Sequence, residues 1–361
     1  LKTELTMTDG SGTAATLLNA TPLAGTYIIT AYLPAHPEVP PVSIKVDVSS
    51  RGWYIMVIIG LLGGLGMFLY GMKMSADGLQ HVAGSRMKNI LSKYTTNPIK
   101  GHVVGFAATA AMQSSSATSA MCVGFVSATL MTLTQTLPVM QGARIGTTIT
   151  AQLVAFRLAD FSLLLVLAGF IMLSFSKKKR INSLGEILAG FGLIFFGMGV
   201  MSDAMAPLRS NPDFTTMLLS LGNQPLLGLL GAALFTAIIQ SSGATVGLCI
   251  AFADQGLITL AGAIPLSIGA MIGTTMTGLL ASLGANRDGK RVAVANLVFS
   301  VIAAAVCLPV LGLIESVTVV VTKAMGSDSL PRQVANAYTL LSVWGVLVCL
   351  PFLKPLEKLV M

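Results

Sequence analysis

Two short polar segments interrupt long apolar stretches of the chain: Gln-Ser-Ser-Ser at 113–116 and Gln-Ser-Ser-Gly at 240–243. Each precedes an apolar stretch of helical character, so its serines stand where an N-cap is expected. The free amides and the positive dipole end of such a helix are typical binding sites for anions. One such segment would more often be a capping turn than a site. Two copies in matching contexts favour a solute site.

Oxygen ligands for a cation accompany the same segments. A Gly-Thr-Thr sequence follows each of them, at 146–148 and at 273–275. Amide and hydroxyl oxygens, together with the carbonyls of broken helices, suit a hard monovalent cation such as sodium. The same segments could also be contacts between helices made by small residues. Anion and cation ligands together indicate a sodium-coupled anion transporter.

Both polar segments belong to an internal repeat. A shift of 127 residues aligns 97–150 with 224–277 without a gap and gives 22 identities in 54 positions. Pro138 then matches Pro265, and the two Gly-Thr-Thr sequences coincide. Chance similarity between apolar stretches would not align the polar residues as well. The sequence therefore predicts two related structural units.

Composition indicates that these units lie in a membrane. Hydrophobic residues make up 54% of the chain and charged residues 10%, and the mean hydropathy is +0.80. Uncharged runs lie at 53–72, 161–176, 292–314 and 333–353. Most are close to the roughly 20 residues that cross a hydrocarbon core. The lipid bilayer is therefore an expected partner.

Basic residues give the expected orientation, because short cytoplasmic loops collect Lys and Arg. Fourteen of the 22 basic residues lie at 73–100, 177–180, 287–291 and 354–358. If these clusters share one side, the first apolar run crosses inward and a later one, at about 187–202, crosses outward. The two repeats are then inverted. The N-terminus is expected outside the plasma (inner) membrane and the C-terminus in the cytoplasm.

This orientation requires each Gln-Ser-Ser segment to enter and leave the membrane on the same side. The stretch at 101–131 is longer than one crossing of about 20 residues and too short for two. We therefore expect re-entrant helical hairpins at 101–131 and 225–255. Their tips would lie near mid-membrane, where backbone outside a helix is tolerated only if it is buried or lines a water-filled cavity.

The first 51 residues differ in kind from the rest. Residues 25–33 and 42–50 alternate apolar and polar side chains and are rich in β-branched and aromatic types, which predicts two strands. A β-sandwich needs about seven strands, so this segment would be part of an immunoglobulin-like module. The expected fold is an all-α polytopic membrane protein with a small β segment. The expected division is 1–51 for the external β segment, 52–180 and 181–291 for the repeats, and 292–361 for C-terminal transmembrane helices.

The doubled pattern of a Gln-Ser-Ser tip and a later Gly-x-x-Ile-Gly-Thr-Thr segment resembles the type II sodium/phosphate cotransporters and their bacterial relatives. The likeness covers about residues 60–290. It implies sodium-driven import of inorganic phosphate by alternating access, with phosphate at the hairpin tips and sodium at the second tip and its Gly-Thr-Thr segment. The family commonly has Asn before Ile-Gly-Thr-Thr, where this chain has Arg144 and Met271.

The site residues follow from the tips, the threonines and this resemblance together. The expected phosphate-binding residues are Gln113, Ser114, Ser115, Ser116, Ser241, Ser242 and Gly243. The expected sodium-binding residues are Gln113, Gln240, Ser241, Thr274, Thr277, Thr147 and Thr150. Sodium is the coupling ion, and no other metal and no cofactor is expected. Arg144 borders an uncharged segment, so it either extends to the membrane interface or raises anion affinity beside the site.

Other classes of protein could share some of these features. An anion channel could use the same hairpins as a filter, a different anion could be the solute, and the β segment would also suit a non-transporting receptor. An enzyme is not expected, because His36, His81 and His102 are too scattered for an acid–base or metal cluster. Nucleic acid is not an expected partner despite the net charge of +8, because the basic residues form no continuous face. A homo-oligomer is compatible with the sequence.

Overall fold

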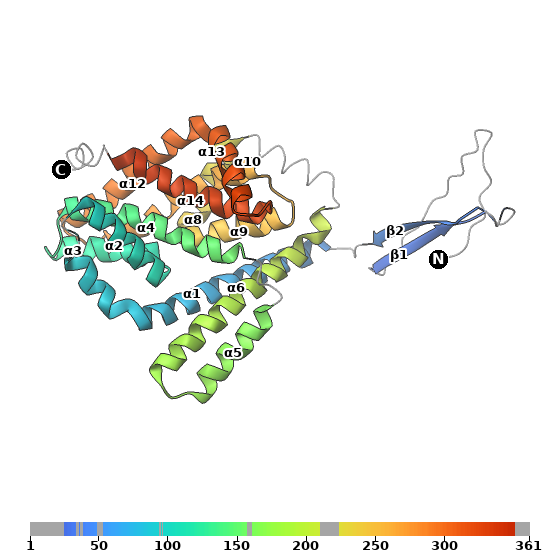
Figure 1. Cartoon of the computed structure of the whole chain (residues 1–361), viewed down its shortest axis with the longest axis horizontal. Coiled ribbons are helices and arrows are strands. Elements are labelled where there is room, and N and C mark those ends of the chain that lie inside the picture. The colour runs from blue at the N-terminus through green and yellow to red at the C-terminus, as the bar shows by residue number, and fades with distance from the viewer. Residues whose placement is uncertain are drawn as a thin grey trace. The chain divides into compact units, whose positions relative to one another are not determined.

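A computed structural model describes residues 25–33, 36, 39–48, 53–93, 95, 97–156, 161–209 and 224–350. It divides into two compact units, Leu1–Ile59 and Gly60–Met361. Within these described ranges the second unit is built of helices, and this confirms the predicted all-α architecture (Figure 1). Residues 351–361, which carry the last basic cluster, lie outside the described part of the chain.

The first unit contains a two-stranded antiparallel sheet. Strands β1 (Gly25–Ala31) and β2 (Val42–Val48) pair so that Gly25 lies opposite Val48 and Ala31 opposite Val42. Both strands were predicted from their alternation of apolar and polar residues. Residues 1–24, where a larger module would need further strands, lie outside the described residues. The immunoglobulin-like assignment therefore stays a prediction.

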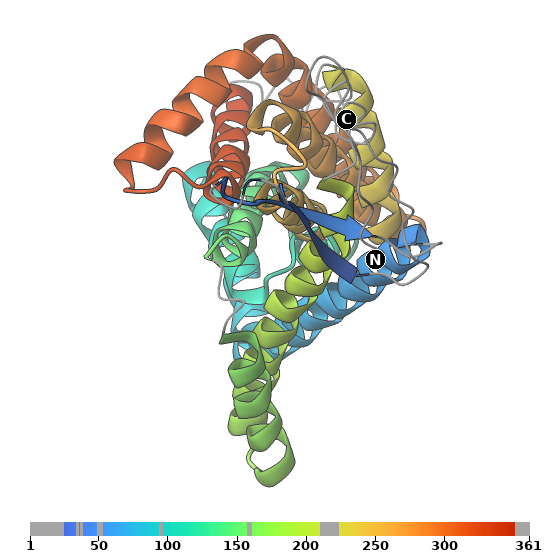
Figure 2. The same cartoon turned by 90° about the vertical axis from the view of Figure 1, so that its right-hand side faces the viewer.

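The helices of the remaining chain follow in order. They are α1 (Trp53–Lys93), α2 (Pro98–Met112), α3 (Ser115–Ser127), α4 (Leu133–Val154), α5 (Ser162–Phe175), α6 (Lys179–Arg209), α8 (Pro225–Ile239), α9 (Ser242–Asp254), α10 (Leu260–Gly273), α11 (Thr275–Ala281), α12 (Arg287–Cys307), η2 (Leu308–Val310), α13 (Leu311–Ala324) and α14 (Leu330–Cys349). Helix α5 lies alongside α6 and away from α8 to α14, as the two views in Figure 1 and Figure 2 show.

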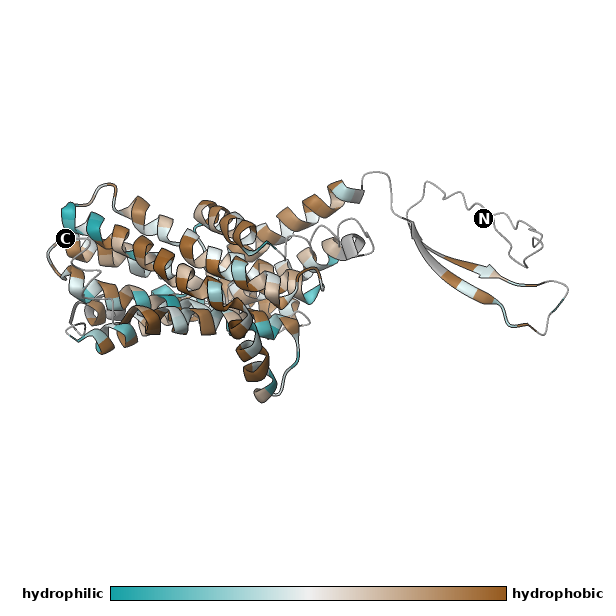
Figure 3. Cartoon of the chain, turned by 90° about the horizontal axis from the view of Figure 1, so that it is seen from above, coloured by the Kyte–Doolittle hydropathy of each residue, from teal (hydrophilic) through white to brown (hydrophobic). Residues whose placement is uncertain are grey.

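Among the described residues, four helical segments are long and apolar enough to cross a membrane, judged by length and composition. They are Tyr54–Val82, Lys179–Met205, Leu260–Ala281 and Arg287–Ala324. Hydrophobic residues predominate along the helices (Figure 3). Many large apolar side chains are exposed there, such as Leu164 at 61% and Phe175 at 83%. Lipid is the solvent that suits such a surface, so the chain is a multi-pass membrane protein.

The two sequence repeats fold alike at the level of helix packing. In the first repeat α2 packs on α4, and in the second α8 packs on α10. Backbones touch at matched glycines: a Cβ on Gly142 would collide with the carbonyl oxygen of His102, and one on Gly269 with that of Leu229. Both pairs of positions are related by the shift of 127. The inverted relation of the repeats stays a prediction.

Each repeat also contains a helix, a break and a second helix, at the residues where a hairpin was expected. We call α2, α3 and the residues between them the first hairpin, and α8, α9 and the residues between them the second hairpin. The second hairpin is held against α1, since a Cβ on Gly247 would collide with the fully buried ring of Phe68. Whether the hairpins re-enter the membrane stays a prediction.

Candidate functional site

The polar segments form the two hairpin tips. Gln113 (φ 51°) and Gln240 (φ 60°) adopt the left-handed conformation that ends the first helix of each hairpin, a conformation uncommon outside glycine. Ser114 and Ser241 then cap the next helix: their hydroxyls accept from the backbone amides of Ala117 at 3.1 Å and Ala244 at 3.2 Å. The predicted N-caps are thereby confirmed, and α3 and α9 both begin at the tips.

A buried pair of threonines braces each hairpin just behind its tip. The hydroxyls of Thr109 and Thr118 are 2.9 Å apart in the first hairpin. Those of Thr236 and Thr245 are 2.6 Å apart in the second. All four side chains are at most 4% exposed. These bonds fix the two helices of a hairpin relative to one another, so the N-terminal turns of α3 and α9 are presented in a set position.

The two tips contact each other although they are more than a hundred residues apart in the chain. The Ser116 hydroxyl donates to the backbone carbonyl of Gln240 at 3.0 Å. Gly243 lies beside α4, where a Cβ would be 3.7 Å from a methyl carbon of Thr150. The Thr150 hydroxyl in turn donates to the side-chain carbonyl of Gln113 at 2.5 Å. The two tips therefore converge on the C-terminal part of α4.

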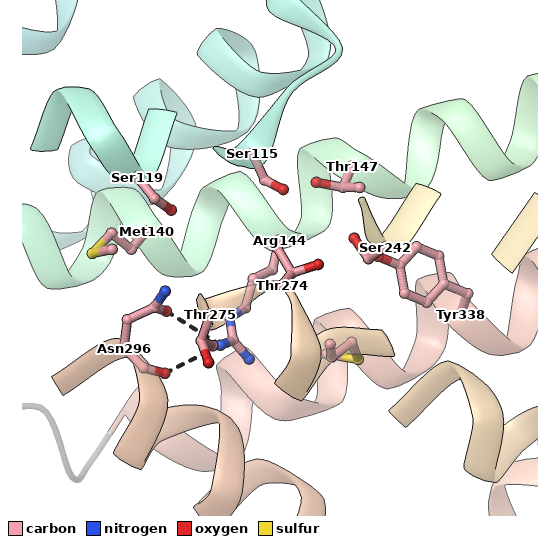
Figure 4. Close-up of a pocket in the computed structure, with 11 residues that line it drawn as sticks. Ser115, Ser119, Met140, Arg144, Thr147, Ser242, Thr274, Thr275, Asn296 and Tyr338 are labelled. Atoms are coloured by element: carbon pink, nitrogen blue, oxygen red, sulfur yellow. Dashed lines mark hydrogen bonds between the residues drawn. The ribbon is translucent and has the colours of Figure 1, made fainter. Parts of the chain in front are cut away.

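A small cavity lies where the tips meet, and we call it the tip cavity (Figure 4). Its walls come from both repeats and from the C-terminal helices α12 and α14. It is lined by Ser115, Ser119, Met140, Arg144, Thr147, Ser242, Met271, Thr274, Thr275, Asn296 and Tyr338. Most of these side chains carry a hydroxyl, amide or guanidinium group, and none is acidic. Such a lining suits a hydrated or anionic solute better than an apolar one.

Arg144 supplies the positive charge of this cavity. Its Nη2 donates to the side-chain oxygen of Asn296 at 3.2 Å, to the backbone carbonyl of Asn296 at 3.3 Å, and to the Ser300 hydroxyl. The guanidinium carbon lies 4.8 Å from the ring centroid of Phe299. Nη1 is buried and has no hydrogen-bond partner in the described part of the chain. The guanidinium is thus anchored on α12 and keeps one donor group unused.

The cavity threonines differ in what their hydroxyls already bind. Thr147 donates to the backbone carbonyl of Ala143 at 3.1 Å, and Thr275 to that of Ile272 at 2.7 Å. The hydroxyl of Thr274 is buried without a partner among the described residues. Thr274 sits where the regular helix is interrupted between α10 and α11. Its oxygen is therefore available to a solute.

Tyr338 closes the cavity from α14. Its hydroxyl donates to the Ser242 hydroxyl at 3.1 Å, and the side chain is 2% exposed. In Figure 4 the Tyr338 ring lies next to Ser242. A residue outside both repeats therefore holds the first side chain of α9.

The structure brings some of the predicted site residues to the cavity and gives the others different surroundings. Ser115, Ser242, Thr147 and Thr274 line it. Ser114 and Ser241 are caps, and Ser116 and Gln240 join the two tips. Thr277 is not in the lining, and its hydroxyl donates to the carbonyl of Thr274 at 2.6 Å. Gln113, Thr150 and Gly243 lie in the contact between the tips and α4 and do not line the cavity.

Several cavity residues were not predicted from the sequence. Ser119 stands four residues after Ser115 on α3, so helical periodicity could have found it. Thr275 belongs to the Gly-Thr-Thr segment but was not selected. Asn296 and Tyr338 come from helices outside the repeats, and no local motif marks them. Asn296 forms an interhelical hydrogen bond with Arg144 of α4.

Comparison with known proteins gives the family. The profile described as Na+/Pi-cotransporter matches residues 67–203 and again 204–328. The chain belongs to the Na+/Pi-cotransporter family. The two successive matches accord with an internal duplication, and the resemblance inferred from the tip motifs is confirmed.

Relatives of this Na+/Pi-cotransporter chain differ in their names. "Uncharacterized protein YqeW" of Bacillus subtilis is 29% identical over 247 residues, 68% of this chain and 80% of YqeW. "Putative inorganic phosphate export protein YjbB" of Escherichia coli K12 is 30% identical over 247 residues, 68% of this chain and 46% of YjbB. Human "Sodium-dependent phosphate transport protein 2B" is 35% identical over 100 residues, 27% of this chain and 14% of that protein. The chain therefore spans about half the length of YjbB, and no solved structure matches it.

Proposed function

We propose that this protein is a sodium-coupled transporter that imports inorganic phosphate by alternating access. The observation that carries the proposal is the tip cavity, where the starts of two helices meet Arg144 and Thr274, whose Nη1 and hydroxyl are buried and have no partner among the described residues. Family membership supports phosphate as the solute. The names of the human and Escherichia coli relatives also refer to phosphate.

Phosphate is the solute that the anionic side of the cavity suits. Ser115 and Ser242 are the first residues of α3 and α9, so their backbone amides belong to the unpaired donors of a helix N-terminus. Two such termini favour a negative charge through their dipoles. Arg144 adds a formal positive charge, and the lining includes no carboxylate to repel an anion. A tetrahedral oxyanion offers several acceptors to these donors.

Sodium is the cation that the oxygen ligands suit. The Thr274 hydroxyl is buried and unpaired, and it lies on the opposite repeat from Arg144. The break between α10 and α11 adds backbone carbonyls whose helical bonding is irregular. Interrupted helices of this kind supply sodium ligands in secondary transporters. We therefore propose that the principal coupling ion binds near Thr274.

The direction of transport follows from coupling. A bound sodium ion that moves with phosphate drives import wherever the sodium gradient points inward. YjbB is named for phosphate export, so the two directions need a direct comparison. Proteoliposomes loaded with or without sodium separate them: an inward gradient should accelerate uptake of labelled phosphate, and an outward gradient should accelerate its release.

The transport assay also separates the transporter from the channel. We expect uptake that saturates with phosphate and disappears when sodium is replaced by potassium. Ser115→Leu and Ser242→Leu should abolish it, because each fills the cavity and removes a hydroxyl at a tip. Ser316→Leu, on an exposed face of α13, is the matched control. Flux that neither saturates nor depends on a sodium gradient would support an anion channel instead.

A further inference from the structure

Arg144 has no counterpart in the second repeat. The position that matches it after the shift of 127 residues is Met271, which lines the same cavity from α10. One repeat therefore offers a permanent positive charge to the cavity and the other offers none.

The bonding of Arg144 is one-sided. Its partners among the described residues belong to α12: Asn296, Phe299 and Ser300 hold the Nη2 edge and one face of the guanidinium. No carboxylate neutralises it within the described residues, since neither the cavity lining nor the observed ion pairs supply one. Nη1 is buried and has no hydrogen-bond partner among the residues that the structure describes. A buried charged donor without a partner is costly, and an arriving anion would remove that cost.

We propose that Arg144 contacts the transported oxyanion through Nη1, and that α12 serves to position its guanidinium. This inference rests on the proposed function, and it names one ligand of the anion and the side of the cavity that the anion occupies. The planar guanidinium donates in fixed directions and pairs well with phosphate-like oxygens. Because the charge is built in, part of the anion affinity does not require sodium.

The first test replaces Arg144 by the residue of the other repeat. Arg144→Met removes a charged hydrogen bond to the anion, and the KM for phosphate at saturating sodium should rise about 10- to 100-fold. Arg144→Lys keeps the charge but loses the planar set of guanidinium donors, and its KM should lie between those of Arg144→Met and the wild type. Arg332→Met is the control, since Arg332 also stacks on a phenylalanine, Phe156 at 4.2 Å, but lies outside the cavity. A folded Arg144→Met protein with a KM within twofold of wild type would overturn the inference.

A binding measurement covers the case in which transport is lost. A ligand that binds the folded state raises its unfolding temperature. Inorganic phosphate without sodium should raise the Tm of the detergent-purified wild type, and the Arg144→Met and Arg144→Gln variants should lose that rise. If Arg144→Met does not fold, Arg144→Lys and Arg144→Gln decide the matter. A phosphate-induced rise that survives in the folded variants would overturn the inference.

The positioning role of α12 has its own readout. Asn296→Ala removes the side-chain oxygen that accepts from Nη2 and keeps the backbone carbonyl, while Nη1 and the charge of Arg144 remain. We expect KM for phosphate to rise a few-fold, with kcat and the sodium concentration for half-maximal uptake unchanged. A purely structural role would instead lower the amount of active protein and leave KM as it was, and that result would contradict a positioning role.

Failure of this inference and failure of the proposed function give different results. If the wild type shows neither sodium-dependent phosphate uptake nor a phosphate-induced rise in Tm, the proposed function fails. Sulfate and other oxyanions are then tested in the same Tm assay. A rise with one of them that depends on Arg144 would support the arginine as an anion ligand for a different solute. The absence of any rise that depends on Arg144 would refute it.

Discussion

Replacement of Thr274 by valine separates the two solutes most clearly. Valine keeps the shape of threonine and removes the buried hydroxyl, which has no partner in the described structure. Folding should therefore lose nothing, because an unpaired buried hydroxyl costs about 1–3 kcal/mol and its removal is neutral or stabilising. The repeat-related change Thr147→Val breaks a bond to the Ala143 carbonyl. That variant should lose about 1 kcal/mol of unfolding free energy.

The sodium dependence of uptake should change more in Thr274→Val than in Thr147→Val, which is the reverse of the order expected for the loss of stability. If the Thr274 oxygen is a direct sodium ligand, its loss resembles the loss of one hydrogen bond to a charged group, about 1.5–3 kcal/mol. The sodium concentration for half-maximal uptake should then rise at least about tenfold. Thr147→Val should change it less, because Arg144 on the same helix repels a nearby cation. Thr277→Val should also act more weakly, since the hydroxyl of Thr277 is already bonded and lies outside the cavity lining.

Sodium-activation curves in proteoliposomes, recorded at saturating phosphate, measure these effects. Thermal unfolding of each purified variant gives the stability change from the same preparation. Phosphate KM at saturating sodium should stay within about threefold of wild type in Thr274→Val, a change below 1 kcal/mol. An unchanged sodium dependence in a stable Thr274→Val protein would remove the Gly-Thr-Thr segment of the second repeat from the cation site.

Three further changes test the packing of α8 on α10, the hydrogen bond from Tyr338 to Ser242, and the orientation of the chain in the membrane. Gly269→Ala places a methyl group against a backbone carbonyl of α8 and should cost about 1–3 kcal/mol in thermal unfolding, whereas Gly231→Ala, which meets nothing within 4 Å, should not destabilise. Tyr338→Phe removes the hydroxyl that donates to the second hairpin tip and should raise the phosphate KM about two- to tenfold; an unchanged KM would show that this bond is only structural. Single cysteines at Lys178 and Gln224 should react with impermeant reagents from opposite sides, the cytoplasmic side for Lys178, and labelling from one side would refute the inverted repeats.

The hairpin breaks could be predicted because their causes are local. Ser114 and Ser241 precede apolar helices, and a serine hydroxyl at that position bonds the next exposed amides. The alignment with a shift of 127 residues showed the same tip and cap in both repeats, so each copy supported the prediction made for the other. Hydropathy predicted three of the four membrane-spanning segments found among the described residues, because the runs at 53–72, about 187–202 and 292–314 fall on Tyr54–Val82, Lys179–Met205 and Arg287–Ala324. The run at 161–176 corresponds to the shorter helix α5.

The composition of the cavity could not be predicted in the same way. Asn296 and Tyr338 reach it from helices that follow the repeats, and their place depends on how α12 and α14 pack against α3, α4 and α9. Thr277 was expected beside Thr274 because residues three positions apart on a regular helix share a face. The helix is interrupted at Thr274, and the cavity includes only that one of the two.

The differences between the repeats indicate how one cavity can serve two ions. The backbone is duplicated: matched tips, matched caps and matched threonine pairs place two helix starts at one point. The side chains facing the cavity are not duplicated, because Arg144 faces it from one repeat while Met271 and an unpaired Thr274 face it from the other. A fixed positive charge repels a cation and attracts an anion over the same few ångströms. An anion bound by Arg144 and a cation bound by Thr274 would each reduce the charge that the other meets, so binding of one would favour binding of the other.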